Sequence, residues 1–283
     1  MELPDTLADL RNFLYQRGEQ KWITSLSISF GVLGLTITGL WLQSTFLIGI
    51  GALASVVAPI AIAWLRESAS LDLQRGDKCR RLILYADSLG HEVPASQMAT
   101  VRAWALGGSI SPAPFVRPYY VSRLVPGPQR LADNVTEAAF FTHALATKLQ
   151  VGLWTAFGIA VIVAATSLIL ADLAKGIIGA TGVAAAKSIG VVLSFLISGD
   201  FALLAKKYGD LKNDARLVFE ASSRLREDSR ATIDDVSPVC EDYGVALLQS
   251  PPVPSWLYLR YQSELNRLYR ESHFQGREGA GPN

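Results

Sequence analysis

The longest uncharged run is the feature that most constrains how this chain can fold. From Trp22 to Leu65 there is no Asp, Glu, Lys or Arg. One helical crossing of a bilayer needs about 20 residues, so this run has room for two. Polar residues at 43–45 divide it near its middle. Backbone groups in hydrocarbon must be satisfied internally, so we expect helical spans at 22–42 and 46–65, joined by a very short turn.

A second apolar block covers 149–205. Its first part, 149–171, has no charge and is predicted as the third span. In the fourth span, Lys187 and Asp200 bracket a short uncharged run, which at 1.5 Å per residue does not cover the hydrocarbon core. These charges either lie near the ends of the span or face a water-filled path. The Gly- and Ala-rich stretch 172–187 is open to interpretation as a loop, a re-entrant piece or the first turns of the fourth span.

The distribution of charge predicts the topology. Only 18% of residues are charged, against about a quarter in soluble domains, and the formal net charge of +1 argues against bulk attraction to nucleic acid. Lys and Arg flank the apolar runs on the sides that the positive-inside rule assigns to the cytoplasm. We therefore expect an all-α membrane protein with two transmembrane helical hairpins (four spans), a helical cytosolic body and both termini in the cytoplasm. The predicted segments are a cytosolic N-terminal segment at 1–21, hairpins at 22–65 and 149–205, a helical insert at 66–148, C-terminal helices at 206–274 and a disordered tail at 275–283.

Helix signals outside the spans place the elements of the cytosolic body. Pro128 suits the first turn of a helix, because it lacks an N–H and its φ is fixed. That helix is expected to run on toward the third span, and Gly90 is expected to end the helix that continues from the second span. The remaining helices are predicted at 66–89, 95–106, 206–230, 233–249 and 256–272.

Motifs for catalysis and metal binding are missing from the sequence. The three histidines do not form HExxH, and neither GxSxG nor GxxxxGK[ST] occurs. Cys79 and Cys240 are far apart, belong to no CxxC pattern and fall in predicted cytosolic segments, which argues against zinc and against a disulfide. We therefore expect no catalytic residues, no metal ligands, no cofactor and no enzymatic activity.

A segment before the third span, "PYYVSRLVPGPQRLADNVTEAAFF", offers chemistry for a ligand. Its aromatic rings can stack on bases, its arginines can donate to phosphate and its amide can read a base edge. The alternative is structural: a rigid Pro-Gly-Pro corner, tyrosines that pack in a core, and a glutamate paired with an arginine. With two arginines from another predicted helix, the candidate ligand-binding residues are Tyr119, Tyr120, Arg123, Arg130, Asn134, Glu137, Arg80 and Arg81.

The order of segments, that motif and "PPVPSWLYLRYQSELNRLYRE" near the end resemble one family over nearly the whole chain. It is the S-4TM family of four-transmembrane pore-forming effectors, associated with bacterial nucleotidyltransferases in CBASS-like anti-phage defence. The resemblance implies that a partner nucleotidyltransferase makes a cyclic or linear oligonucleotide, and that the membrane protein then alters ion flow until the infected cell dies. The residues that match the motif are Tyr119, Tyr120, Arg123, Pro126, Gly127, Arg130, Asn134, Glu137 and Phe141.

The leading hypothesis is an oligomeric ion channel or pore of the bacterial inner membrane, controlled by a nucleotide. Four helices enclose little space alone, so a homo-oligomer, with a tetramer as the working number, would supply the pathway. Lys187 and Asp200 are the candidate pore or gate residues. A non-conducting scaffold that recruits a soluble partner through its C-terminal helices is the alternative. A membrane-embedded enzyme is a third possibility, for which the sequence offers no cluster of reactive residues.

Overall fold

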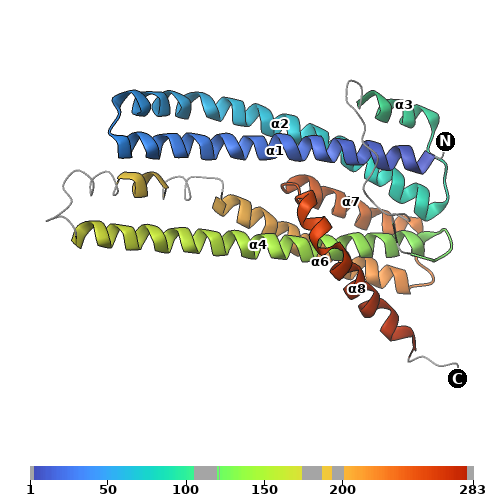
Figure 1. Cartoon of the computed structure of the whole chain (residues 1–283). Coiled ribbons are helices and arrows are strands. Elements are labelled where there is room, and N and C mark those ends of the chain that lie inside the picture. The colour runs from blue at the N-terminus through green and yellow to red at the C-terminus, as the bar shows by residue number, and fades with distance from the viewer. Residues whose placement is uncertain (1–2, 105–119, 121, 174–186, 193–200, 279–283) are drawn as a thin grey trace. The chain divides into compact units, whose positions relative to one another are not determined.

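The computed structural model describes residues 3–104, 120, 122–173, 187–192 and 201–278 (Figure 1). Within these ranges every regular element is a helix, which confirms the prediction of an all-α chain. The long helices are α1 (Leu3–Leu42), α2 (Thr45–Leu89), α3 (Ala95–Trp104), α4 (Pro128–Leu173), α6 (Phe201–Glu227), α7 (Ile233–Gln249) and α8 (Ser255–Glu278), with a further helical segment at 187–192.

Contacts between residues divide the chain into two units. We call them the body and the apolar unit. The body comprises Met1–Arg17, Leu71–Lys148 and Lys207–Asn283, and the apolar unit comprises Gly18–Ser70 and Leu149–Lys206. The segment boundaries predicted from the sequence mark where the chain is expected to enter and leave the bilayer. These positions stay predictions.

The apolar unit contains the residues that give the chain its transmembrane character. Among the described residues, three helices, α1, α2 and α4, are long and apolar enough to cross a membrane. The side chains of Phe46, Val56 and Ile60 on α2 are 74%, 70% and 72% exposed. A soluble protein would cover such a surface, whereas lipid tails can solvate it. Asp200 and part of the predicted fourth span lie outside the described residues.

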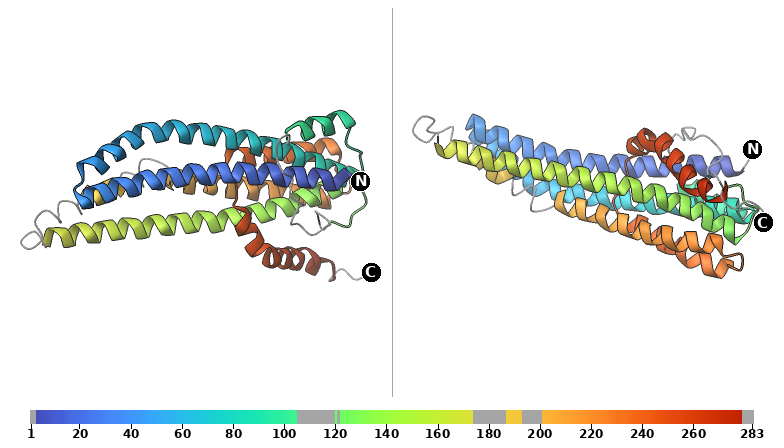
Figure 2. Two further views of the ribbon diagram at one scale, coloured as in Figure 1. Left: turned by 45° about the horizontal axis from the view of Figure 1, so that its top comes forward. Right: turned by 90° about the horizontal axis from the view of Figure 1, so that it is seen from below.

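Helices α1 and α2 run side by side in the apolar unit (Figure 2). The turn between them lies at 43–44, where Gln43 adopts a left-handed φ of 51° and Ser44 Oγ accepts a hydrogen bond from Leu47 N at 3.3 Å. This bond satisfies an N–H group of the first turn of α2. Close packing follows at Gly39, where an added Cβ would lie 3.1 Å from Ile48 N. The very short turn that the polar residues predict is therefore present.

Among the described residues, the core of the body draws on α1, α2, α3, α4, α6 and α7. Fully or almost fully buried side chains include Leu14 of α1, Leu84 of α2, Val101 of α3, Val135 of α4 and Val236 of α7. Burying an aliphatic side chain of this size contributes about 1.5–3 kcal/mol. The core is therefore the main source of stability for the body.

The N-terminal segment is part of that core. The sequence assigned 1–21 to the cytosol without predicting its structure, and α1 runs from Leu3 without a break into the first apolar run. Leu7, Leu10 and Leu14 are 1%, 1% and 0% exposed. Their spacing of three and four residues is that of one helix face, and it is the signal that could have predicted the helix.

Several predicted helix ends agree with the structure. Helix α2 ends at Leu89, α4 begins at Pro128, and α7 covers Ile233–Gln249. At the start of α7 the carboxylate of Asp235 accepts the backbone N–H of Thr232 at 2.8 Å. Hydrogen bonds from the Thr232 hydroxyl and N–H stabilise the charged form, so the pKa of Asp235 is lowered.

The tail predicted at 275–283 lies only partly within the described residues. Residues 275–278, which the sequence assigned to a disordered segment, continue α8 to Glu278. Arg277 and Glu278 are good helix formers, and a helix that has already formed gains a hydrogen bond with each added residue.

Gly90 provides the first testable prediction. Its φ of +69° is left-handed, and its N–H donates to Ala86 O at 3.0 Å to close the last turn of α2. Gly90→Ala should lower the free energy of unfolding by about 1 kcal/mol, because a side chain is strained in this conformation. Thermal unfolding of the detergent-solubilised chain measures the effect.

Gly152→Ala is the matched control for this prediction. Gly152 lies inside α4, and an added Cβ would meet nothing within 4 Å. Its replacement should leave the melting temperature unchanged or slightly higher, since alanine favours helix. Equal melting temperatures for the two variants and the parent would show that the left-handed residue is not needed to end α2.

Candidate functional site

Two of the predicted ligand-binding residues hold a carboxylate of α2. Arg130 Nη2 donates to Asp87 Oδ1 at 2.9 Å, and Asn134 Nδ2 donates to Asp87 Oδ2 at 2.9 Å and to Ser88 Oγ at 2.8 Å. Asn134 is completely buried. Arg130 Nη1 also donates to Leu124 O at 3.2 Å. These bonds connect the start of α4 to the end of α2. Both side chains therefore have a structural role in the described structure.

Arg80 and Arg81 gather around a second carboxylate. Asp77 Oδ1 accepts from Arg80 Nε at 2.8 Å, and Asp77 Oδ2 lies 3.1 Å from Arg81 Nε. Arg80 and Asp77 are buried, and the Arg80 guanidinium lies over the Tyr243 ring at 4.7 Å from its centre. Arg81 is only partly buried. Two guanidinium groups thus share one carboxylate, which leaves one net positive charge there.

The other predicted residues have varied surroundings. Tyr120 is 6% exposed in the core of the body, Glu137 is buried in α4, and Arg123 is exposed. Lys187 is exposed in the segment 187–192. Tyr119 and Asp200 lie outside the described residues. Their proposed roles as ligand or pore residues stay predictions.

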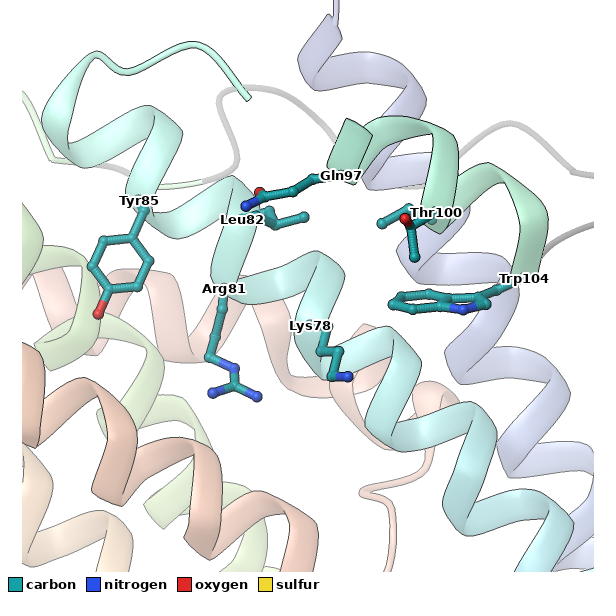
Figure 3. A pocket seen from close by; sticks show the side chains of 8 residues that line it. Lys78, Arg81, Leu82, Tyr85, Gln97, Thr100 and Trp104 are labelled. Atoms are coloured by element: carbon teal, nitrogen blue, oxygen red, sulfur yellow. The ribbon is translucent and has the colours of Figure 1, made fainter. Parts of the chain in front are cut away.

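An open groove of about 420 Å³ lies between α2 and α3 (Figure 3). Pockets of drug-sized ligands have volumes of about 300–1,000 Å³. Each helix contributes residues at positions i, i+3, i+4 and i+7, the spacing of a single helix face. The lining residues are Lys78, Arg81, Leu82 and Tyr85 of α2, and Gln97, Thr100, Val101 and Trp104 of α3.

The chemistry of the groove favours an anion that carries a ring. Lys78 Nζ lies 5.6 Å from the centre of the Trp104 ring, so cation and indole are neighbours (Figure 3). None of the eight lining residues is acidic. Lys78 and Arg81 can donate to phosphate oxygens, Trp104 and Tyr85 offer ring faces, and Gln97 and Thr100 supply hydrogen-bonding side chains.

Sequence reasoning found only one residue of this groove, Arg81. Lys78 and Tyr85 stand three residues before and four residues after it, on the same predicted helix. Trp104 belongs to the next predicted helix. The pattern of polar and aromatic residues on two consecutive helix faces was the available signal. It could not show that these two faces meet.

The two cysteines belong to the core. Both are free and buried, and burial raises the pKa of the Cys240 thiol to about 12. A thiol with such a pKa is a poor nucleophile at neutral pH, because almost none of it is ionised. In the part of the chain that the structure describes, no group of three or more His, Cys, Asp or Glu side chains is arranged to hold a metal ion.

Comparison with known proteins adds no identification. No family model, no curated protein and no solved structure matches this chain. The structure and sequence together define the class as a helical transmembrane protein with a separate helical body.

Proposed function

We propose that this chain is a nucleotide-controlled membrane effector, in which the groove between α2 and α3 binds the ligand. The observation that carries the proposal is the combination of Lys78, Arg81 and Trp104 in one open groove. Phosphates are held by lysine and arginine donors, and bases stack on aromatic rings. Arg80 and Arg130 pair with the carboxylates of Asp77 and Asp87. Arg81 also pairs with Asp77, but it is only partly buried and lines the groove together with the exposed Lys78.

The ligand is proposed to control an ion pathway in the apolar unit. One uninterrupted helix, α2, carries Lys78 and Arg81 as well as the apolar residues predicted to span the membrane. A ligand that binds one arrangement of α2 more tightly shifts the population toward that arrangement. Because α2 is continuous, a change at the groove can reach the membrane through this one helix, and no further binding site is needed.

The wider biological role follows from the resemblance to four-transmembrane effectors. In this proposal the protein is a multi-pass protein of the bacterial inner membrane with four spans and both termini in the cytoplasm. A partner nucleotidyltransferase supplies the cyclic or linear oligonucleotide, and opening of the pore kills the infected cell. A homo-oligomer, taken as a tetramer, encloses the pathway, with Lys187 and Asp200 as pore or gate residues and no enzymatic step in this chain.

Ion flux from liposomes tests the proposal. Purified full-length chain is reconstituted, and release of trapped potassium is measured with and without a cyclic dinucleotide. We expect flux that the nucleotide changes at least severalfold, and a variant carrying Lys78→Gln and Arg81→Gln that no longer responds. Potassium flux that is the same with and without the cyclic dinucleotide would reject the proposal that nucleotides of this class control the pathway. Absence of flux in both states would reject the pore and favour the scaffold alternative.

A further inference from the structure

The beginning of α8 has an unusual exposed face. Trp256 and Leu259 are 57% and 50% exposed. On the opposite face, Leu257, Leu265 and Tyr269 are 6%, 2% and 5% exposed and pack into the body. The inner face of α8 is therefore apolar and packs on the body. At its beginning, the helix also presents two large apolar side chains on its outer face.

Two contacts within the body join the beginning of α8 to residues that adjoin the apolar runs in the sequence. Tyr208 donates its hydroxyl to Pro252 O at 2.8 Å, and Tyr208 lies three residues after the predicted end of the fourth span. Lys148 Nζ lies 3.9 Å from the centre of the Tyr261 ring, and Lys148 immediately precedes the third apolar run. Both contacts lie within the body. From the sequence, the chain is predicted to cross the membrane boundary within a few residues of both contacts.

We propose that Trp256 and Leu259 insert into the headgroup layer of the bilayer that the same chain spans. Tryptophan is enriched at membrane interfaces, where its ring is apolar and its N–H can find a polar partner. Amphipathic helices that lie in this layer combine such residues with cations that bind anionic lipids. Arg260, next to Leu259, and Lys207, at the start of the body's part of α6, are exposed cations at the same end.

The size and charge of this face favour lipid over another protein as its occupant. A stable protein interface buries about 800 Å² on each partner, which two apolar side chains do not supply. The exposed cations Lys148, Lys207 and Arg260 complement the negative surface of a membrane. Two of these cations adjoin apolar runs in the sequence, so their closeness to lipid follows from chain connectivity.

Site-specific quenching tests this inference. Leu259→Cys and, as the matched control, Leu268→Cys are labelled with an environment-sensitive fluorophore in the full-length chain, one copy per nanodisc. Leu268 is 38% exposed on the same helix, about 14 Å farther along its axis. The native thiols are buried, so the label reacts at the introduced cysteine. The probes are nitroxide-labelled headgroup lipid and aqueous iodide.

The expected result is a reversal between the two positions. Lipid nitroxide should quench the label at position 259 severalfold more than the label at 268, and iodide should do the opposite. Arg260→Gln should weaken lipid quenching at 259 in nanodiscs with phosphatidylglycerol more than in phosphatidylcholine alone. Equal quenching at both positions would overturn the proposal. Protection from iodide that appears only with several copies per disc would assign the face to a contact between copies and also overturn it.

Discussion

Asp77→Asn is expected to lower the free energy of unfolding of the body by about 3–5 kcal/mol, the cost typical of breaking a buried ion pair from one side. The substitution preserves the shape of the side chain and removes its charge. Arg80 is 4% exposed, and within the described residues its Nη1 makes no hydrogen bond. The variant therefore leaves a buried guanidinium without its counterion. Thermal unfolding of the detergent-solubilised chain gives the order of stabilities.

Two further variants make this prediction specific. Arg81→Gln should cost much less, since the pair of Asp77 with Arg80 remains and Arg81 is partly exposed. A double variant with Asp77→Leu and Arg80→Met should recover part of the loss, because no buried charge is left alone. A melting temperature for Asp77→Asn as high as that of Arg81→Gln would show that Asp77 is not the counterion that Arg80 depends on.

The second large expected effect concerns the proposed binding of a nucleotide to the groove. Lys78→Gln and Arg81→Gln should each weaken binding of a cyclic dinucleotide about tenfold to 100-fold, because a hydrogen bond to a charged group is worth about 1.5–3 kcal/mol. Trp104→Leu should weaken it by a similar factor through the loss of base stacking. Isothermal titration calorimetry with the full-length chain in detergent measures the affinities.

Inorganic pyrophosphate separates the two kinds of contact in the groove. The variants of Lys78 and Arg81 should lose its binding, whereas Trp104→Leu should retain it, because pyrophosphate has no ring. Arg102→Gln is the matched control, as Arg102 is an exposed cation of α3 that does not line the groove. Normal nucleotide binding by the groove variants, with loss of binding in Arg123→Ala, would move the site to the segment before α4.

Local signals in the sequence predicted most of the helix ends. Gly90 and Pro128 act through their own backbone geometry, so their positions could be read without knowledge of the fold. The polar turn at 43–45 is similar, because it interrupts a run that only helices can satisfy in lipid. The fourth span depends on the surroundings of Lys187 and Asp200, which composition does not determine.

Predictions that depend on tertiary partners were weaker. The sequence grouped Arg80 with Arg81 as phosphate donors, yet the two face different surroundings: Arg80 lies against Tyr243 of α7, and Arg81 reaches the groove. Adjacent residues on a helix point about 100° apart, so neighbours in sequence often serve different faces. Asp87 could not be paired with Arg130 from a single sequence, because 43 positions separate them.

The hydrogen bond from Gly127 N to Ser88 O, at 2.8 Å, has a consequence for how the chain can vary. Together with the bonds of Arg130 and Asn134 to Asp87, it brings the end of α2 and the beginning of α4 together. The stretch between them, which includes α3, therefore departs from and returns to nearly one point. A change in the length of this stretch would therefore leave the register of α2 against α4 unchanged, as long as these hydrogen bonds remain. Under the proposed function, changes in this stretch would alter the α3 side of the groove while Lys78 and Arg81 of α2 stay in place.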